Sequence, residues 1–113
     1  MYKRQLLLDE PTTFLDIAHQ MEVLDLVAEL NTDHGVTVVL VLHDLNQACR
    51  YADHIVAMKD GDIAAEGAPS EVIVAEVVHH VFGLDCVVIA DPVAGTPLVV
   101  PALRAQRADR ASA

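Results

Sequence analysis

The sequence predicts an α/β fold in which parallel core strands alternate with helices, followed by a β-hairpin and a small α+β extension. Apolar runs of strand length alternate along the chain with stretches of helical periodicity. The 113 residues suffice for one domain with a modest core. Hydrophobic residues make up 53% of the chain, with a mean hydropathy of +0.36, which suggests that a partner or a further segment covers apolar surface.

The first strand and the first helix follow from the residues before Gly35. Leu6–Leu8 is a short apolar run that indicates a buried strand, and Asp9 begins the polar stretch that ends it. Asp16 is a candidate N-cap for the next helix, which should end at Gly35 because glycine can adopt the left-handed C-cap conformation. The apolar residues of this helix recur at steps of three and four: Ile17, Met21, Leu24, Val27 and Leu30.

The middle of the chain predicts a second parallel strand, a short helix and a hairpin. Val36–His43 is almost continuously apolar, which is typical of a parallel strand covered on both faces. Asp44 should cap a short helix that continues to Tyr51. The hairpin that follows consists of the strands His54–Lys59 and Asp62–Glu66 and the turn Asp60–Gly61.

The last third predicts two helices and two short strands. Pro69 is suited to the first turn of one helix, and Gly83 ends another that includes His79–Phe82. The final strands, Cys86–Ala90 and Leu98–Val100, flank a turn.

Charge and composition exclude some classes of protein. The formal net charge is −10 with seven basic residues, whereas a nucleic-acid binder presents a basic face. No apolar run approaches the ~18 residues that cross a bilayer, and the N-terminus lacks the apolar core of a secretory signal. We therefore expect a cytoplasmic protein without direct membrane insertion, and Cys49 and Cys86 as buried free thiols.

Two adjacent carboxylates follow the first strand. Ligands of open α/β sheets bind beyond the carboxyl ends of the strands. Phosphate chemistry with Mg²⁺ needs one carboxylate near the ion and another group that orients or deprotonates a water. Asp9 and Glu10 can divide these tasks because successive strand side chains diverge. An ordinary helix start with Pro11 in its first turn explains the same residues, and on the dipeptide alone it is the commoner case.

His43 closes the second apolar run. A histidine there can donate a hydrogen bond to a terminal phosphate. A polar residue that merely ends a strand, beside the capping Asp44, also explains it and, taken alone, is the commoner case.

The order of these stretches resembles one family. LLLDEPTTFLD (6–16), an amphipathic helix and VTVVLVLHDL (36–45) resemble the ATP-binding cassette (ABC) ATPases of membrane transporters. In that family the first stretch is the Walker B motif with the D-loop, and the histidine is the switch residue of the H-loop. Residues 81–101 look like the C-terminal end of the branch that imports iron–siderophore complexes, haem or cobalamin. The resemblance covers about residues 6–101 and implies the C-terminal half of a P-loop nucleotide-binding cassette.

The resemblance implies a role for each site residue. Asp9 becomes the carboxylate associated with Mg²⁺, and Glu10 the general base for the attacking water. Asp16 becomes the D-loop residue that communicates across an ATP-sandwich dimer, and His43 contacts the γ-phosphate. The implied cofactors are ATP and Mg²⁺. The implied partners are a second copy of the subunit and a membrane permease, at the cytoplasmic face of the inner membrane.

Two motifs of the family do not occur in the sequence: the phosphate-binding loop G-x-x-x-x-G-K-[ST] and the Leu-Ser-Gly-Gly-Gln signature. Both lie upstream of Walker B in the family. A base and a metal ligand without a phosphate cradle cannot position ATP, so we expect no hydrolysis by this chain alone. The family's strand order also places Leu6–Asp9 beside Thr37–Leu42. It predicts that Ile55–Lys59 does not pair with Thr37–Leu42, because the phosphate-loop strand belongs between these two.

The two ends of the chain differ from its middle. Residues 1–5 are polar where apolar residues should lead into a buried strand. The codons GTG TAT AAG AGA CAG, the end of a transposon-tagmentation sequencing adapter, encode this run. We therefore expect that residues 1–5 are not native, that residues 6–101 form a partial ABC domain, and that residues 102–113 are disordered.

Two alternatives stay open on the sequence. The chain can be a natural interaction module that uses part of the cassette fold without catalysis. It can also be a metal-binding protein that uses His79 and His80, although adjacent helical residues point ~100° apart, which is poor geometry for one ion.

Overall fold

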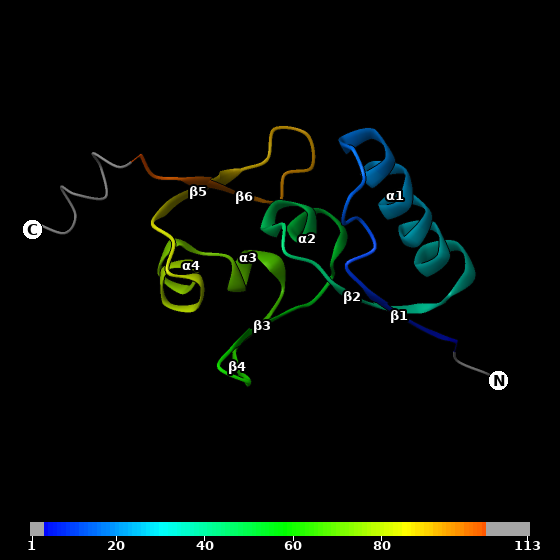
Figure 1. Cartoon of the computed structure of the whole chain (residues 1–113), viewed down its shortest axis with the longest axis horizontal. Helices are drawn as coiled ribbons and strands as arrows, with labels where there is room; N and C mark the ends of the chain where they lie inside the picture. The colour runs from blue at the N-terminus through cyan, green and yellow to red at the C-terminus, as the bar shows by residue number, and fades with distance from the viewer. Residues whose placement is uncertain (1–3, 104–113) are drawn as a thin grey trace, which may run out of the picture. The chain divides into compact units, whose positions relative to one another are not determined.

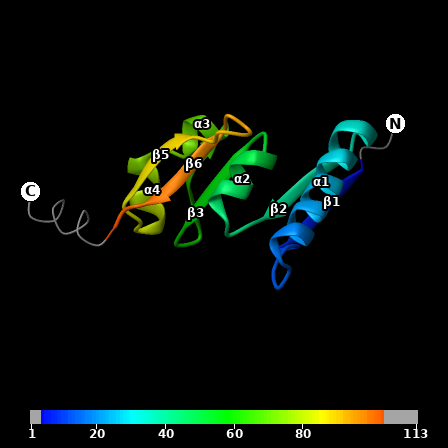
Figure 2. The ribbon, with the colours of Figure 1, turned by 90° about the horizontal axis from the view of Figure 1, so that it is seen from above.

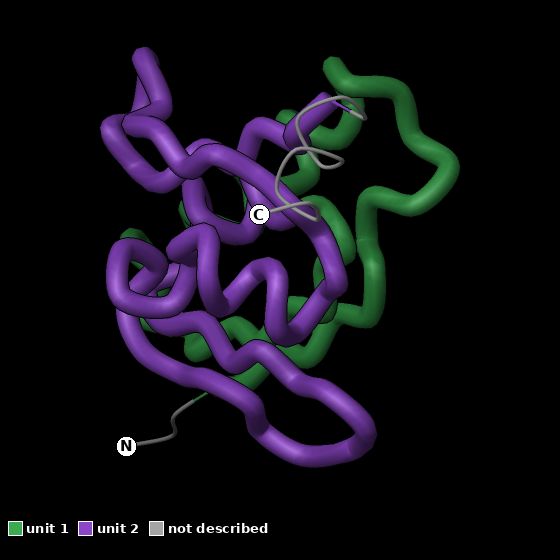
Figure 3. The backbone as a smooth tube through the Cα atoms, turned by 90° about the vertical axis from the view of Figure 1, so that its left-hand side faces the viewer, with its two compact units in different colours: residues 1–44 green, residues 45–113 purple. Residues whose placement is uncertain are grey.

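The computed structural model describes residues 4–103. It divides into two compact units, residues 1–44 and residues 45–113 (Figure 3). The boundary falls between Asp44 and Leu45, directly after the second apolar strand. The expectations for residues 1–3 and 104–113 concern positions outside the described range.

The first unit consists of two parallel strands and one helix (Figure 1). Its elements are β1 (Gln5–Asp9), α1 (Ile17–His34) and β2 (Thr37–Val41). β1 pairs with β2 in parallel, from Gln5 opposite Thr37 to Asp9 opposite Val41. This confirms the predicted pairing. The ladder also includes residues before Leu6, since the Thr37 N–H donates to the Arg4 carbonyl oxygen at 3.0 Å.

The two faces of this small sheet differ in burial. α1 lies along the strands and contacts β2 (Figure 1, Figure 2), and its buried residues are Leu24 and Val27. On the opposite face Leu7, Val39 and Val41 are exposed, Leu7 by 72%. The expectation of a second strand covered on both faces is therefore wrong for the described residues, because one helix covers only one face of the pair.

The predicted caps of α1 are confirmed. The Asp16 side chain accepts the His19 N–H, and Gly35 ends the helix with φ of 64°. The predicted apolar stripe is only partly right, because Ile17 in the first turn is exposed.

Within residues 45–103 the second unit contains three helices and two antiparallel hairpins. Its elements are α2 (Leu45–Tyr51), β3 (Ile55–Lys59), β4 (Asp62–Gly67), α3 (Pro69–Val72), α4 (Ala75–Phe82), β5 (Cys86–Ala90) and β6 (Pro97–Pro101). β3 pairs with β4 through the turn Asp60–Gly61, where both residues have positive φ, as a two-residue type I′ turn requires. β5 pairs with β6. Among the described strands, β3 has β4 as its partner.

The core of the second unit is small and apolar. Its buried members are Cys49, Ala57, Val72, Ile73, Val78, Cys86 and Val99. Both cysteines are free thiols in this core, which confirms their predicted state. Within residues 4–103 we find no helix with the length and apolar character needed to span a membrane.

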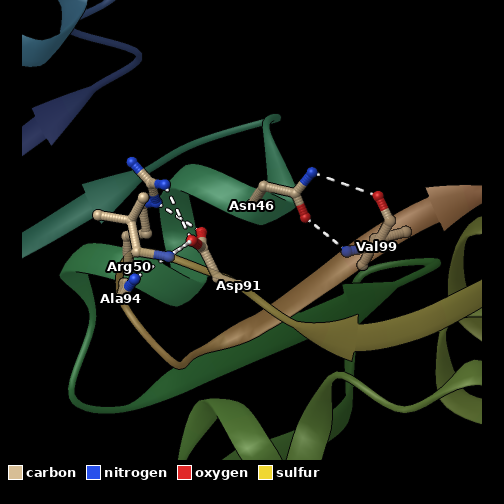
Figure 4. Close-up of polar contacts among 6 residues, drawn as sticks. Asn46, Arg50, Asp91, Ala94 and Val99 are labelled. Carbon is tan, nitrogen blue, oxygen red and sulfur yellow. Dashed lines mark hydrogen bonds and ion pairs between the residues drawn. The ribbon is translucent and has the colours of Figure 1, made fainter.

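Polar side chains of α2 hold the β5–β6 hairpin (Figure 4). The Asn46 amide accepts the Val99 N–H at 2.7 Å and donates to the Val99 carbonyl oxygen at 3.3 Å. Arg50 forms two hydrogen bonds with the Asp91 carboxylate, at 2.7 and 3.0 Å. Asp91 also accepts the N–H groups of Val93 and Ala94 in the hairpin loop. We call these residues the α2 clamp: Asn46, Arg50, Asp91 and Val99.

The clamp changes the ionisation of its carboxyl group. The Arg50 guanidinium and the backbone N–H groups of the loop hold the pKa of Asp91 well below its usual range. The same hydrogen bond to Asp91 raises the pKa of Arg50. The Asp91 residue is only 4% exposed, so the pair neutralises a carboxylate that would otherwise be buried alone.

Candidate functional site

The candidate site lies at the carboxyl ends of β1 and β2. Because the two strands run parallel, their carboxyl ends meet at one edge of the sheet. Asp9 is the last residue of β1 and is exposed. Glu10 follows with its N–H donating to the Val41 carbonyl oxygen at 2.9 Å, so the backbone pairing continues one residue past the strand.

The structure brings Glu10 and His43 together. His43 lies two residues after the end of β2, and its Nε2 forms an ion-pair contact with Oε1 of Glu10. The other carboxylate oxygen, Oε2, accepts a hydrogen bond from Thr13 Oγ1 at 2.6 Å. The Glu10 side chain is 28% exposed and that of His43 is 81% exposed. A half-buried carboxylate is thus held between a hydroxyl group and an accessible imidazole.

The turn after Glu10 excludes one of the two explanations of the acidic pair. Glu10 has φ of 52°, in the left-handed region that a glutamate seldom adopts. Residues 11–14 form turns, with the Thr13 N–H donating to the Glu10 carbonyl oxygen at 3.3 Å. The helix begins only at Ile17. The explanation of these residues as an ordinary helix start with Pro11 in its first turn is therefore wrong.

Asp16 stands apart from the Glu10–His43 pair. It is the N-cap of α1, and its Oδ1 accepts the His19 N–H at 2.9 Å and lies 2.8 Å from His19 Nδ1. Both residues are exposed. The described contacts of Asp16 are local, and its role in a dimer stays a prediction.

Sequence reasoning missed two residues that shape the site. Thr13 contacts the Glu10 carboxylate, and Gln20 of α1 donates from Nε2 to the Leu15 carbonyl oxygen at 2.9 Å and to that of Thr12 at 3.4 Å. Gln20 thereby ties the turn to the helix. The sequence signal that could have indicated the first contact is a threonine three residues after the acid, with a proline between them.

The residues present fit a magnesium ion held mainly by a nucleotide. Magnesium is usually bound through one or two protein carboxylates together with substrate phosphates and water. Asp9 offers one accessible carboxylate, which makes no hydrogen bond or ion pair within residues 4–103. The same range contains no group of three or more His, Cys, Asp or Glu side chains that could hold a metal by themselves. Asp9 therefore fits a shared site and not a self-contained one.

The adjacent histidines of α4 have different surroundings. His79 Nε2 lies 3.5 Å from Oδ1 of Asp85, and the backbone carbonyl of His80 accepts a hydrogen bond from Lys59 Nζ at 2.7 Å. These contacts give the two residues separate partners.

Comparison with curated proteins finds transport ATP-binding proteins. The chain is 59% identical over 96 residues to the ferric enterobactin transport ATP-binding protein FepC of Escherichia coli K12. It is 56% identical over 106 residues to the achromobactin transport ATP-binding protein CbrD of Dickeya dadantii. These matches cover 85% and 94% of this chain but 35% and 39% of the relatives, so the chain spans little more than a third of their length. No model of a known protein family matches the chain.

Solved structures share the fold. The chain matches an inward-facing ABC transporter described as of the metal-chelate type, with a TM-score of 0.80 and 27% identity, over 91% of this chain and 42% of that one. It matches a dimeric ATP-binding cassette bound to ADP and phosphate with a TM-score of 0.54 and 38% identity, over 57% of this chain and 27% of that one.

The curated relatives and the solved structures point to one family. The chain belongs to the ATP-binding proteins of the ATP-binding cassette (ABC) transporters.

Proposed function

We propose that this chain is the part of an iron-siderophore importer's ATP-binding subunit that carries the hydrolytic carboxylate, and that the intact subunit hydrolyses ATP to drive uptake. The contact of Glu10 with His43 at adjacent strand ends carries the proposal. The relatives named for enterobactin and achromobactin transport support the substrate class.

Glu10 acts as the general base. Its carboxylate is partly exposed, so water can reach it, and each oxygen keeps a lone pair beyond the contact it makes. It accepts a proton as the water attacks the terminal phosphate. Two partners limit the orientations of the carboxylate, and fixed orientation of a reacting group lowers the barrier.

His43 and Asp9 serve the phosphates. The exposed imidazole of His43 can donate a ring N–H to a phosphate oxygen. Asp9 would hold Mg²⁺, which supplies positive charge against the phosphate oxygens when it is bound. Asp16 would face the second copy of the subunit.

The partners and the location belong to the intact protein. They are a second copy of the subunit and a membrane permease, at the cytoplasmic face of the inner membrane, with ATP and Mg²⁺ as cofactors. Because the sequence contains no phosphate-binding loop, we expect neither ATP turnover nor saturable ATP binding by this chain alone.

A chimera tests the proposal. This chain would replace the matching segment of the E. coli relative, to which it is 59% identical. ATP hydrolysis and ATP retention would be measured for the chimera, for Glu10→Gln, for His43→Ala and for Glu22→Gln. We expect Glu10→Gln to abolish turnover while ATP stays bound, and His43→Ala to lose most turnover.

Glu22→Gln is the matched control, since Glu22 is an exposed acid of α1, and it should hydrolyse ATP like the parent chimera. Full turnover in Glu10→Gln would refute the proposal. A folded chimera that binds ATP but does not hydrolyse it would favour the non-catalytic interaction module instead.

A further inference from the structure

Thr13 is placed to control the orientation of the Glu10 carboxylate. Its Oγ1 donates to Glu10 Oε2 at 2.6 Å, while His43 contacts Oε1. The two contacts come from different parts of the chain: Thr13 lies three residues along the turn, and His43 lies two residues past the end of β2. A free glutamate side chain has three rotatable bonds and loses this freedom only when both oxygens are held.

The backbone of the turn is already held at both residues, so this hydrogen bond costs little further conformational entropy. The Glu10 N–H donates to Val41, and the Thr13 N–H donates to the Glu10 carbonyl oxygen, so both ends of the contact are held before the side chains meet. Threonine is branched at Cβ, which restricts its χ1 angle and favours a fixed direction for the hydroxyl.

Folding does not require the contact. Thr13 is exposed, so water can satisfy its hydroxyl group if the bond is lost. A donor on one carboxylate oxygen also leaves lone pairs for a water, so the bond does not block proton transfer. The contact therefore has an effect on the carboxylate that is separable from any effect on stability.

We propose that Thr13 is a positioning residue for Glu10: its hydroxyl holds one carboxylate oxygen and so directs the other toward His43. The catalytic meaning of this orientation rests on the proposed function, whereas the orientation itself is a property of this chain.

NMR of the chain with ¹³C-labelled glutamate tests the orientation directly. Thr13→Val removes the hydroxyl and keeps the branched shape, Thr13→Ser restores a hydroxyl, and Thr32→Val is the matched control. Thr32 is an exposed residue whose hydroxyl donates to the Ala28 carbonyl oxygen at 3.0 Å, away from Glu10. We expect Thr13→Val to shift the Glu10 carboxyl signal and weaken its contacts to the His43 ring, with Thr13→Ser and Thr32→Val close to the parent. An unchanged Glu10 signal in Thr13→Val overturns the proposal.

The chimera with the E. coli relative tests the consequence. We expect Thr13→Val to lower kcat about tenfold with KM for ATP nearly unchanged, because only the reacting group is misplaced, and Thr13→Ser to recover most of kcat. A normal kcat in Thr13→Val also overturns the positioning role. If Thr13→Val does not fold, Thr13→Ala removes the same hydroxyl. Retained turnover in Glu10→Gln would instead defeat the proposed function, while the NMR result would still decide whether Thr13 orients Glu10.

Discussion

At the scale of single residues, experiments can separate the cap role of Asp16 from its predicted role in a dimer. The resemblance to the family predicts a dimer contact, whereas the structure shows a helix N-cap whose carboxylate accepts the His19 N–H. Asparagine caps a helix about as well as aspartate, but alanine does not. If Asp16→Asn loses activity or stability, the cause is therefore the missing charge and not a missing helix cap.

We expect Asp16→Ala to lower the free energy of unfolding by about 1 kcal/mol, and Asp16→Asn to change it much less. Urea unfolding followed by circular dichroism measures both. Glu22 is exposed and lies away from the ends of α1, so Glu22→Ala controls for the loss of an acid from the same helix. Equal losses in Asp16→Ala and Glu22→Ala would contradict the cap.

Asp91 predicts how stability depends on pH. Its pKa is lowered in the folded chain, chiefly by the hydrogen bond from Arg50, while an unfolded aspartate titrates near ~3.9. The folded state therefore binds fewer protons, so the stabilisation is present above about pH 4 and is lost as the pH falls through the folded pKa.

We expect the free energy of unfolding to decrease as the pH is lowered from about 4. In Asp91→Asn this decrease should be smaller. Urea titrations at successive pH values measure it, with Glu66→Gln, an exposed acid of β4, as the control. If the parent chain and Asp91→Asn lose stability in parallel as the pH falls, Asp91 is not the source of the pH dependence.

At the scale of elements, three residues keep the outer edge of β6 from pairing with another strand: Pro97, Pro101 and Asn46. The Asp91 N–H bonds to Thr96, and the Ala102 N–H bonds to Asp85, which marks hydrogen-bonded pairs at both ends of the hairpin. Since bonded and non-bonded pairs alternate, the backbone groups of Pro97, Val99 and Pro101 face outward. The prolines have no N–H, and Asn46 takes both groups of Val99. The edge therefore has no free donor for another strand.

We expect Asn46→Ala to destabilise the chain by about 1–3 kcal/mol, because the Val99 backbone groups lose both partners in a partly buried place. Hydrogen exchange measures the local effect: the Val99 amide should lose protection. The Ala102 amide, bonded to the Asp85 carbonyl oxygen at 2.8 Å, serves as the internal reference. Full protection of Val99 in the variant would show that Asn46 is not its partner.

At the scale of the whole molecule, the exposed face of β1 and β2 should drive self-association. Leu7 and Val39 lie opposite each other in the ladder, and Val41 continues the same face. Contiguous apolar surface of this kind favours contact between molecules. Part of the apolar surface that the composition predicts thus lies on this face.

We expect the chain to form oligomers at micromolar concentration, and Val39→Thr combined with Leu7→Thr to shift it toward the monomer. Threonine keeps strand propensity while reducing apolar surface at Val39. Sedimentation velocity measures the distribution. Val87→Thr, at an exposed valine of β5, is the control, and an equal shift in that variant would argue against a specific face.

Much of the fold could be predicted from local pattern. The apolar runs, the caps Asp16 and Gly35 and the turn Asp60–Gly61 all act within a few residues, so their elements lie close to where the sequence placed them. The burial of β2 could not be predicted, because an apolar run does not show how many faces a helix will cover.

The sequence by itself determined the order of the elements, because apolar runs, caps and turns act locally. The strand order of the family that it resembles placed Glu10 and His43 at the ends of neighbouring parallel strands, and the structure has this pairing. Only the tertiary structure decided which side chains meet. Asn46 reaches Val99 across 53 residues and Arg50 reaches Asp91 across 41. The hydroxyl of Thr13 reaches Glu10 only because the turn puts Glu10 in the left-handed region. Such contacts depend on where the backbone places two side chains in space, and no periodicity or cap in the sequence carries that information.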